Sequence, residues 1–406
     1  MTTKSEIEGR YAKVRLAMAE ADVSALIVCG SEYTGFEGAV RYLSGFRIVH
    51  RYAYVLVPQV GEPCAVFPSE ARYVGAHSES WVEEKVFAEH PGDWMRQCLE
   101  NRGATRVGIY GLDYVMPVRD HQALAAGGLE LVAFDEQFDL ARAVKSAEEL
   151  VEVRHTVAVN EAGFWAVHAA YEPGRTQAEL MAQAEAEFTR LGTGRQTMDM
   201  VLWGRQGAAE PEFRIPELVD PIRVDDLLLF SLEVAGPGGY WGEFARPLCR
   251  GVLAPDTIRM LDAYEEYFEL TQRTMKKGMT AHDVHRAVSR PFLDRGIGLG
   301  HVTGHSIGMT MIEHPRIGEG VEVELAEDMV IAMHPHAIAS DGKSCMYIQD
   351  TWLVGVDGAE RLSGVPAKVF DGSEDRAENG ASAGGAGAPL TSVAPDDGTA
   401  YGVTAS

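Results

Sequence analysis

Short apolar runs alternate with segments of helical spacing in the first part of the chain. Residues 1–20 place apolar side chains along one side of an amphipathic helix. Four later runs are short, apolar and bounded by turn residues, which predicts buried strands at 25–29, 52–57, 63–67 and 106–109. Alternation of helices and strands is typical of an α/β domain, which we expect over residues 1–142.

The pattern changes at residue 143, where a long segment with apolar positions at helical spacing begins. Ser146 followed three residues later by Glu149 is a capping-box signature, which predicts a helix that runs to residue 170. Further helices are expected at 176–191 and 255–276, and strands at 198–202, 227–232, 329–333 and 351–354. Helices and strands in this order indicate an α+β domain over residues 143–370.

Composition limits the partners and the location that we expect. The formal net charge of −24 would repel a nucleic acid or an anionic membrane, so neither is expected as a partner. We recognise no signal peptide and no apolar run that could span a bilayer, and the five cysteines have no metal or disulfide spacing. These features favour a cytoplasmic protein. Residues 371–406 are rich in Gly, Ala and Ser, which predicts a disordered tail.

Two carboxylates flank a predicted tight turn in residues 231–246. Glu233 ends an apolar strand, the Gly-Pro-Gly-Gly sequence at 236–239 favours a hairpin, and Glu243 lies on the return strand. Such a hairpin can bring the two carboxylates together, where they could hold a cation, raise one another's pKa or bind a cationic substrate. Taken alone, the pair is also compatible with two exposed acids of an acidic protein.

A second polar segment contains several histidines between apolar residues. His301 and His305 lie four residues apart beside Gly304 and Gly308, and Glu313 follows. Glycines there would let the backbone approach a ligand closely, and histidine can act as base, acid or metal ligand near neutral pH.

A third segment places polar side chains at the ends of predicted buried strands. His334 ends one apolar strand, and Gln349 leads into another. A polar group in such a position needs a hydrogen-bonding partner, which could be a ligand or simply another core residue.

In this order, the three segments resemble the pita-bread hydrolases, the superfamily of creatinase, prolidase and aminopeptidase P. The matching motifs are Gly-Tyr to Arg at 239–246, Gly-His-x-x-Gly at 304–308, Glu313 with Pro315, Asp-Met-Val at 328–330, the segment 347–354, Ala-Val-Lys-Ser at 143–146 and Tyr-Leu-Ser-Gly-Phe at 42–46. The resemblance covers residues 8–370. It implies an α/β N-terminal domain, an α+β pita-bread catalytic domain and a homodimer.

Metallopeptidases of this superfamily hold two metal ions with two Asp, one His and two Glu, and only the histidine, His305, matches. The other four positions fall at Leu232 or Glu233, Glu243, His334 and Gln349. Too few carboxylates remain to compensate two dications, so the sequence predicts no dinuclear centre.

Two interpretations of the site remain open. In the one that we favour there is no metal, and the pattern is similar to creatinase and ectoine hydrolase: His305 or Glu243 activates water, His334 contacts the oxyanion and Glu233 binds a substrate cation. In the other, these four residues hold one divalent transition-metal ion. The candidates for substrate binding are His301, Glu313, Gln349, Arg246 and Tyr240 and, from a neighbouring subunit, Arg47, His50 and Arg51.

The expected function is hydrolysis of a non-peptide C–N bond in a small zwitterionic or amide substrate by metal-independent acid–base catalysis. Three alternatives stay open. Two of them, an Xaa-Pro dipeptidase-like hydrolase and a small-molecule lyase, would use a remodelled mononuclear metal site. The third is a non-catalytic pita-bread binding module, against which the remaining polar groups argue.

Overall fold

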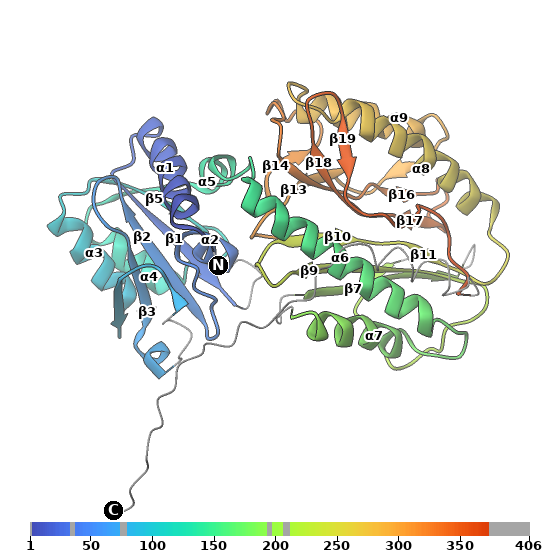
Figure 1. Cartoon of the computed structure of the whole chain (residues 1–406), viewed down its shortest axis with the longest axis horizontal. Coiled ribbons are helices and arrows are strands. Elements are labelled where there is room, and N and C mark those ends of the chain that lie inside the picture. Colours follow the sequence, from blue (N-terminus) through green and yellow to red (C-terminus); the bar gives the residue numbers. More distant parts are fainter. Residues whose placement is uncertain (1, 33–36, 74–78, 193–196, 206–211, 373–406) are drawn as a thin grey trace, which may run out of the picture. The chain divides into compact units, whose positions relative to one another are not determined.

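The N-terminal domain is built on a six-stranded mixed sheet. The computed structural model describes residues 2–32, 37–73, 79–192, 197–205 and 212–372. The sheet has the strand order β4-β3-β2-β1-β5-β6 (Figure 1). The strands are β1 (Ala25–Ser31), β2 (Tyr52–Pro58), β3 (Cys64–Pro68), β4 (Glu84–Ala88), β5 (Arg106–Tyr110) and β6 (Glu130–Ala133). Strand β1 runs antiparallel to β2 and parallel to β5. All four strands predicted from apolar runs are present.

Helices cover both faces of this sheet, and alternate residues of β1 point to opposite faces. Leu26 and Val28 pack in one apolar cluster, while Ile27 and Cys29 pack in another. The first cluster includes α1 (Lys4–Glu20), α2 (Gly38–Ser44) and α5 (Asp135–Ala141), and the second includes α3 (Pro91–Asn101) and α4 (Val118–Ala125). The apolar run of β1 is therefore buried on both sides, as an α/β domain requires.

In the described part of the chain, the second domain has four helices. They are α6 (Ala147–Ala170), α7 (Gln177–Arg190), α8 (Pro255–Thr274) and α9 (Ala281–Leu293). The predicted capping box is present, because Ser146 Oγ accepts from the Glu149 amide at 3.2 Å and Glu149 Oε2 accepts from the Ser146 amide at 2.8 Å. Helix α9 was not among the predicted elements. It contains Pro291, which interrupts the helical signal of the sequence.

Three sheets complete the second domain, and two of them carry the site. The first is β10-β9-β7-β8 with β11 beside β9, the second is β14-β13-β15-β18-β19, and the third is β12-β16-β17. Their strands are β7 (Thr197–Arg205), β8 (Glu212–Arg214), β9 (Asp226–Ala235), β10 (Trp241–Phe244), β11 (Pro247–Leu248), β12 (Gly298–Leu299), β13 (Gly304–Ser306), β14 (Glu313–Ile317), β15 (Val330–Met333), β16 (His336–Ile338), β17 (Cys345–Tyr347), β18 (Asp350–Val354) and β19 (Ala359–Arg361).

A short antiparallel bridge joins the first two of these sheets. The amide of Ala245 donates to the carbonyl of Gln349 at 3.2 Å, and the amide of Gln349 donates back at 3.3 Å. Helices α6 and α7 pack against β9 (Figure 1). Helices α8 and α9 share an apolar cluster with β15 and β18. The bridge brings the ends of β10 and β18 together, and the candidate site lies there.

The observed architecture agrees with the predicted fold class, an α/β domain followed by an α+β domain. The chain up to Gly372 forms one compact unit, and the predicted disordered tail lies outside the described residues from residue 373 onward. No helix among the described residues has both the length and the apolar character needed to cross a membrane.

Candidate functional site

The β9–β10 hairpin places two carboxylates opposite each other. Glu233 and Glu243 are direct cross-strand partners, so their side chains project from the same face of the sheet. The turn closes through the amide of Gly239, which donates to the Gly236 carbonyl at 2.8 Å while Gly239 adopts a φ of 88°. Glycine adopts this backbone conformation without strain, which explains the Gly-Pro-Gly-Gly sequence. Both carboxylates are buried, so the alternative of two exposed acids is wrong.

The neighbouring sheet supplies two histidines to the same place. His305 lies in the middle of β13, and His334 follows β15, where its amide donates to the Thr303 carbonyl at 2.8 Å. The Nε2 atoms of His305 and His334 lie 3.3 Å and 3.9 Å from the two carboxylate oxygens of Glu243. One ligand atom from each of these three residues falls within 4.8 Å of the others.

Burial governs the protonation of this cluster. It raises the pKa of Glu243, to which the nearby Glu233 carboxylate contributes further, and it also raises the pKa of Glu233. Burial lowers the pKa of His305 to about 4 and that of His334 well below its ordinary value. Both imidazoles are therefore neutral near pH 7, as metal ligands or proton acceptors must be.

The tautomer of His305 follows from its backbone contact. Its Nδ1 lies 3.0 Å from the carbonyl of Ser306, which only accepts, so Nδ1 carries the proton and Nε2 presents a lone pair. That lone pair faces Glu243 Oε1, which is also an acceptor in the ionised carboxylate. Two acceptors at this distance need a proton or a cation between them.

Gln349, the residue that precedes β18, connects the two carboxylates. Its Nε2 donates to Glu243 Oε2 at 2.6 Å and to Glu233 Oε1 at 3.0 Å. The Ser231 hydroxyl lies 3.0 Å from the amide oxygen of Gln349 and 2.8 Å from Glu233 Oε1. Thr351 on β18 fixes the backbone of β10, since its hydroxyl accepts from the Glu243 amide at 3.0 Å.

This set of donors fits one metal ion better than two. Glu243, His305 and His334 provide the two-histidine, one-carboxylate combination that holds single transition-metal ions. The Nδ1 atom of His334 is buried and has no hydrogen-bond partner among the described residues, so packing and not a hydrogen bond at Nδ1 orients this ring. Two dications would face only two carboxylates, and the residues at hand do not fit a dinuclear centre.

His301 lies beside this cluster at its exposed side. Its ring centroid is 5.2 Å from that of His334, 5.5 Å from that of His336 and 5.8 Å from that of Tyr347. His301 is exposed whereas His334 is buried, so His301 is the histidine of this group that solvent reaches. Its role in substrate binding stays a prediction.

Three other predicted substrate-binding residues are engaged by the protein itself. The Tyr240 hydroxyl donates to Glu149 at 2.7 Å, and Glu313 forms ion pairs with Arg142 at 3.1 Å and Lys145 at 3.2 Å. The guanidinium of Arg246 pairs with Asp350 at 2.9 Å and donates to the backbone carbonyls of Ala245, Gln349, Val365 and Pro366. These contacts brace the loops and strands around the site, so we no longer assign the three residues to substrate.

The basic residues Arg47, His50 and Arg51 are not brought to the cluster within one chain. Arg51 forms an ion pair with Glu70, and its amide donates to Glu32 at 2.9 Å. Arg47 lies near Glu37, whose pKa burial raises to about 7 against the opposing effect of this arginine. His50 is exposed. A contact of these residues with a neighbouring subunit stays a prediction.

The glycines around His305 serve the protein rather than a ligand, which corrects the sequence interpretation. A Cβ at Gly304 would meet the Ala332 carbonyl of the adjacent strand. A Cβ at Gly308 would meet the carboxylate of Glu313. Both glycines therefore allow neighbouring protein atoms to approach the backbone closely.

Sequence reasoning missed Ser231 and Thr351, which hydrogen-bond within the cluster. Both occur at strand positions where a signal was available, because side chains two residues apart point to the same face of a strand. Ser231 precedes Glu233 by two residues, and Thr351 follows Gln349 by two. Polar residues at this spacing inside an apolar strand indicate a shared polar pocket.

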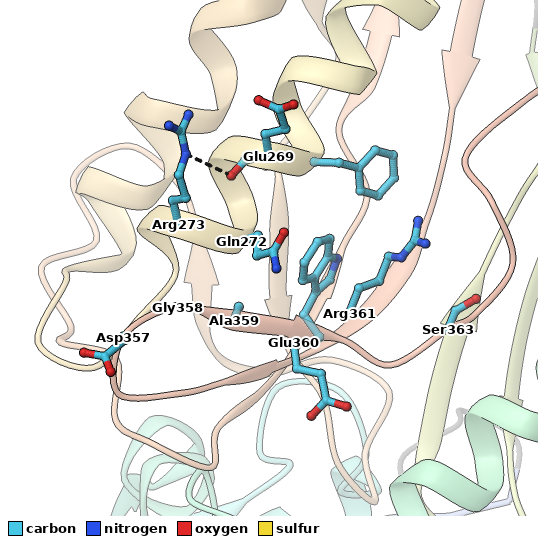
Figure 2. A pocket seen from close by; sticks show the side chains of 11 residues that line it. Glu269, Gln272, Arg273, Asp357, Gly358, Ala359, Glu360, Arg361 and Ser363 are labelled. Carbon is cyan, nitrogen blue, oxygen red and sulfur yellow. Dashed lines mark hydrogen bonds between the residues drawn. The ribbon is translucent and has the colours of Figure 1, made fainter.

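A separate surface groove contains none of the predicted site residues. Figure 2 shows this groove, in which Arg273 donates to the backbone carbonyl of Glu269 at 3.4 Å. The lining residues are Phe268, Glu269, Gln272, Arg273, Trp352, 357–361 and Ser363. We therefore place the candidate site at the buried cluster and not in this groove.

The fold and the cluster together define a two-domain hydrolase of the pita-bread type. Residues 152–355 match metallopeptidase family M24, and residues 10–144 match the creatinase/prolidase N-terminal domain. The chain belongs to metallopeptidase family M24, and its predicted superfamily is confirmed.

Solved structures and a sequence relative agree with this assignment. The prolidase from Pyrococcus horikoshii OT3 superposes with a TM-score of 0.75 at 20% identity, covering 88% of this chain and 99% of that one. The dipeptidase PepE from Mycobacterium ulcerans superposes with a TM-score of 0.74 at 22% identity, covering 90% and 98%. The Xaa-Pro dipeptidase of Lactobacillus delbrueckii subsp. lactis is 27% identical over 353 residues, 80% of this chain and 90% of that protein. The protein is thus a peptidase-like hydrolase of this family.

Proposed function

We propose that the protein hydrolyses the amide bond of small dipeptide-like substrates and uses one divalent transition-metal ion to do so. Glu243, His305 and His334 would hold the ion. The observation that carries the proposal is the convergence of two neutral imidazole Nε2 atoms on the buried Glu243 carboxylate, at 3.3 Å and 3.9 Å. A cation between His305 Nε2 and Glu243 Oε1 would bind both lone pairs and remove the repulsion between these two acceptors.

The residues around these ligands supply the remaining requirements of amide hydrolysis. When bound, such an ion polarises a carbonyl oxygen and lowers the pKa of a water molecule. The two hydrogen bonds described for Glu233 both use Oε1, which leaves Oε2 able to hold a proton and pass it to a leaving amine. Burial raises the pKa of Glu233, which favours the protonated acid that this role requires. His301 would contact the substrate at the exposed side.

The named relatives support a peptide-type substrate over the non-peptide substrate that the sequence alone favoured. The Lactobacillus relative is named an Xaa-Pro dipeptidase, and the two solved neighbours are a prolidase and a dipeptidase. Xaa-Pro dipeptides are therefore the first substrates to test. We further propose a cytoplasmic homodimer in which Arg47, His50 and Arg51 approach the partner's substrate carboxylate, because bidentate arginine suits that group.

A second candidate function is metal-free hydrolysis of a non-peptide C–N bond. The observation in its favour is the Gln349 amide, which gives a hydrogen bond to each buried carboxylate without any ion. Burial raises the pKa of Glu243, and its protonated carboxyl could donate a hydrogen bond to His305 Nε2 in place of a metal ion.

The metal content and the substrate profile together separate these two functions. The full chain is purified without added metal, its metal is quantified by plasma mass spectrometry, and Xaa-Pro dipeptides, small amides, ureas and cyclic amidines are assayed before and after chelation. One ion per chain and dipeptide hydrolysis that chelation abolishes would support the proposal. Activity on small amides that survives complete chelation would instead establish the metal-free function.

Matched histidine variants show whether the bound ion occupies this cluster. His305→Asn removes a proposed ligand and should abolish stoichiometric metal binding. His155→Asn changes an exposed histidine of α6 and should leave the metal content unchanged. Equal metal content in the two variants would contradict the ligand assignment.

A further inference from the structure

The amide nitrogen of Gln349 occupies the space between the two buried carboxylates. It lies 2.6 Å from Glu243 Oε2 and 3.0 Å from Glu233 Oε1. A carboxamide nitrogen has two hydrogens, and these two contacts use one each. Carboxylate oxygens cannot donate, so the nitrogen must face them, and the amide oxygen is turned toward the Ser231 hydroxyl at 3.0 Å.

The backbone holds Gln349 firmly in this position. Gln349 is fully buried, and its backbone amide and carbonyl both pair with Ala245, which lies two residues after Glu243. Its carbonyl also accepts from the guanidinium of Arg246 at 3.0 Å. These three hydrogen bonds fix the backbone from which the side chain projects, and burial together with the contacts to Ser231, Glu233 and Glu243 holds the amide itself in place.

The charges at the site lead to the same conclusion as the geometry. Glu233 and Glu243 supply at most two negative charges, while Gln349, His305 and His334 are neutral. One dication balances this set when both carboxylates are ionised, and two would leave an excess of positive charge in either protonation state, in a buried place where unpaired charge is strongly unfavourable.

From this arrangement we infer that Gln349 determines the number of metal ions, because its amide fills the place that a second cation would need between Glu233 and Glu243. The inference rests on the proposed function, in which the first ion lies at Glu243, His305 and His334. Replacing the amide by a carboxylate removes both hydrogen-bond donors and adds a third buried negative charge, which lowers the excess charge of a two-ion site from two to one. The Gln349→Glu variant should then bind one more ion per chain than the wild type.

The experiment compares the full-length wild type with Gln349→Glu and with Gln183→Glu. The second variant makes the same chemical change at an exposed position on α7 and controls for added surface charge. Each protein is stripped by chelation, reloaded with Mn²⁺ and desalted, and bound manganese is measured by plasma mass spectrometry. Melting temperatures with and without Mn²⁺ establish that each variant is folded. Gln349→Asp, whose side chain is shorter by one methylene, replaces Gln349→Glu if that variant does not fold.

The difference between variant and wild type tests the inference, and the wild-type value tests the proposed function. One additional Mn²⁺ in Gln349→Glu, with a larger Mn²⁺-induced rise in melting temperature than in Gln183→Glu, would support the role of Gln349. Two ions in the wild type, or no additional ion in the folded carboxylate variant, would overturn it. A wild type without manganese whose Gln349→Glu variant gains an ion would overturn the proposed function alone.

Discussion

Arg142 is the centre of a buried ion cluster that connects α5 with the loop following His305. Its guanidinium pairs with Asp139 at 2.8 Å and with Glu313 at 3.1 Å, and it donates to the Thr310 hydroxyl at 2.8 Å. Arg142 is 2% exposed, and its two carboxylate partners are equally inaccessible to water. The Arg142→Met change keeps much of the side-chain volume but leaves two buried carboxylates without this cation.

The expected loss of stability follows from what remains around the two acids. Breaking a buried ion pair by removing one partner costs about 3–5 kcal/mol. Lys145 still pairs with Glu313 at 3.2 Å, and the ring of His314 lies 3.1 Å from Asp139, so we expect a value near the lower limit. With an unfolding entropy of about 2.1 cal/mol/K per residue, a loss of about 3 kcal/mol corresponds to a decrease in melting temperature of roughly 4 °C for a chain of this length.

Thermal unfolding followed by circular dichroism at neutral pH measures this effect. The matched control is Arg154→Met, which breaks an exposed two-bond pair with Glu360 and should cost less than about 1 kcal/mol. In the double variant Arg142→Met with Asp139→Asn, one of the stranded acids is neutral, so part of the stability should return. Equal decreases for Arg142→Met and Arg154→Met would refute the reasoning.

Two further predictions concern pH dependence and close backbone packing. The hydrogen bond to Asp139 raises the pKa of His314, so its stabilisation is present below the unfolded-state pKa of about 6.5 and is lost as pH rises through the folded pKa. The melting temperatures of wild type and His314→Ala should therefore differ most at acidic pH, and a constant difference would contradict this sign. A Cβ at Gly38 would collide with the Met309 carbonyl, so Gly38→Ala should lower the melting temperature and the catalytic rate. Gly9→Ala, on the exposed side of α1 with open space, should instead stabilise the protein by up to about 1 kcal/mol, and the reverse order would be inconsistent with the packing.

The secondary structure was predictable wherever local signals were strong. The capping box at Ser146 and Glu149 located the start of α6, and the apolar run of 25–29 located β1. Local rules work here because caps and apolar runs act through neighbours in sequence. Helix α9 was missed because its proline weakens the local signal, whereas packing of its apolar face against the β13–β15 sheet decides the outcome.

The residues that gather at the candidate site were also predictable from the sequence, but the contacts of individual residues were not. Glu233, Glu243, His305 and His334 were predicted to lie together, and the structure places Glu243 opposite Glu233 on the hairpin and near both histidines of the neighbouring sheet. Arg246 and Glu313 looked equally suited to a substrate in sequence. Only the structure pairs Arg246 with Asp350, and Glu313 with Arg142 and Lys145. A charged side chain in a buried place takes whichever partner the packing brings within reach, and that partner lies 104 residues away for Arg246 and more than 160 away for Glu313.

By itself, the sequence determined the family motifs, the two-domain order and the replacement of carboxylates at the metal positions, because these properties depend on residue identity and local spacing. The tertiary structure alone decided that Gln349 donates to both acids, that His305 presents its Nε2 lone pair to Glu243, and that the nearby glycines accommodate protein atoms. These facts depend on strand register and on contacts between two sheets. Neither is encoded in any short segment, since each results from packing residues that lie far apart in the chain.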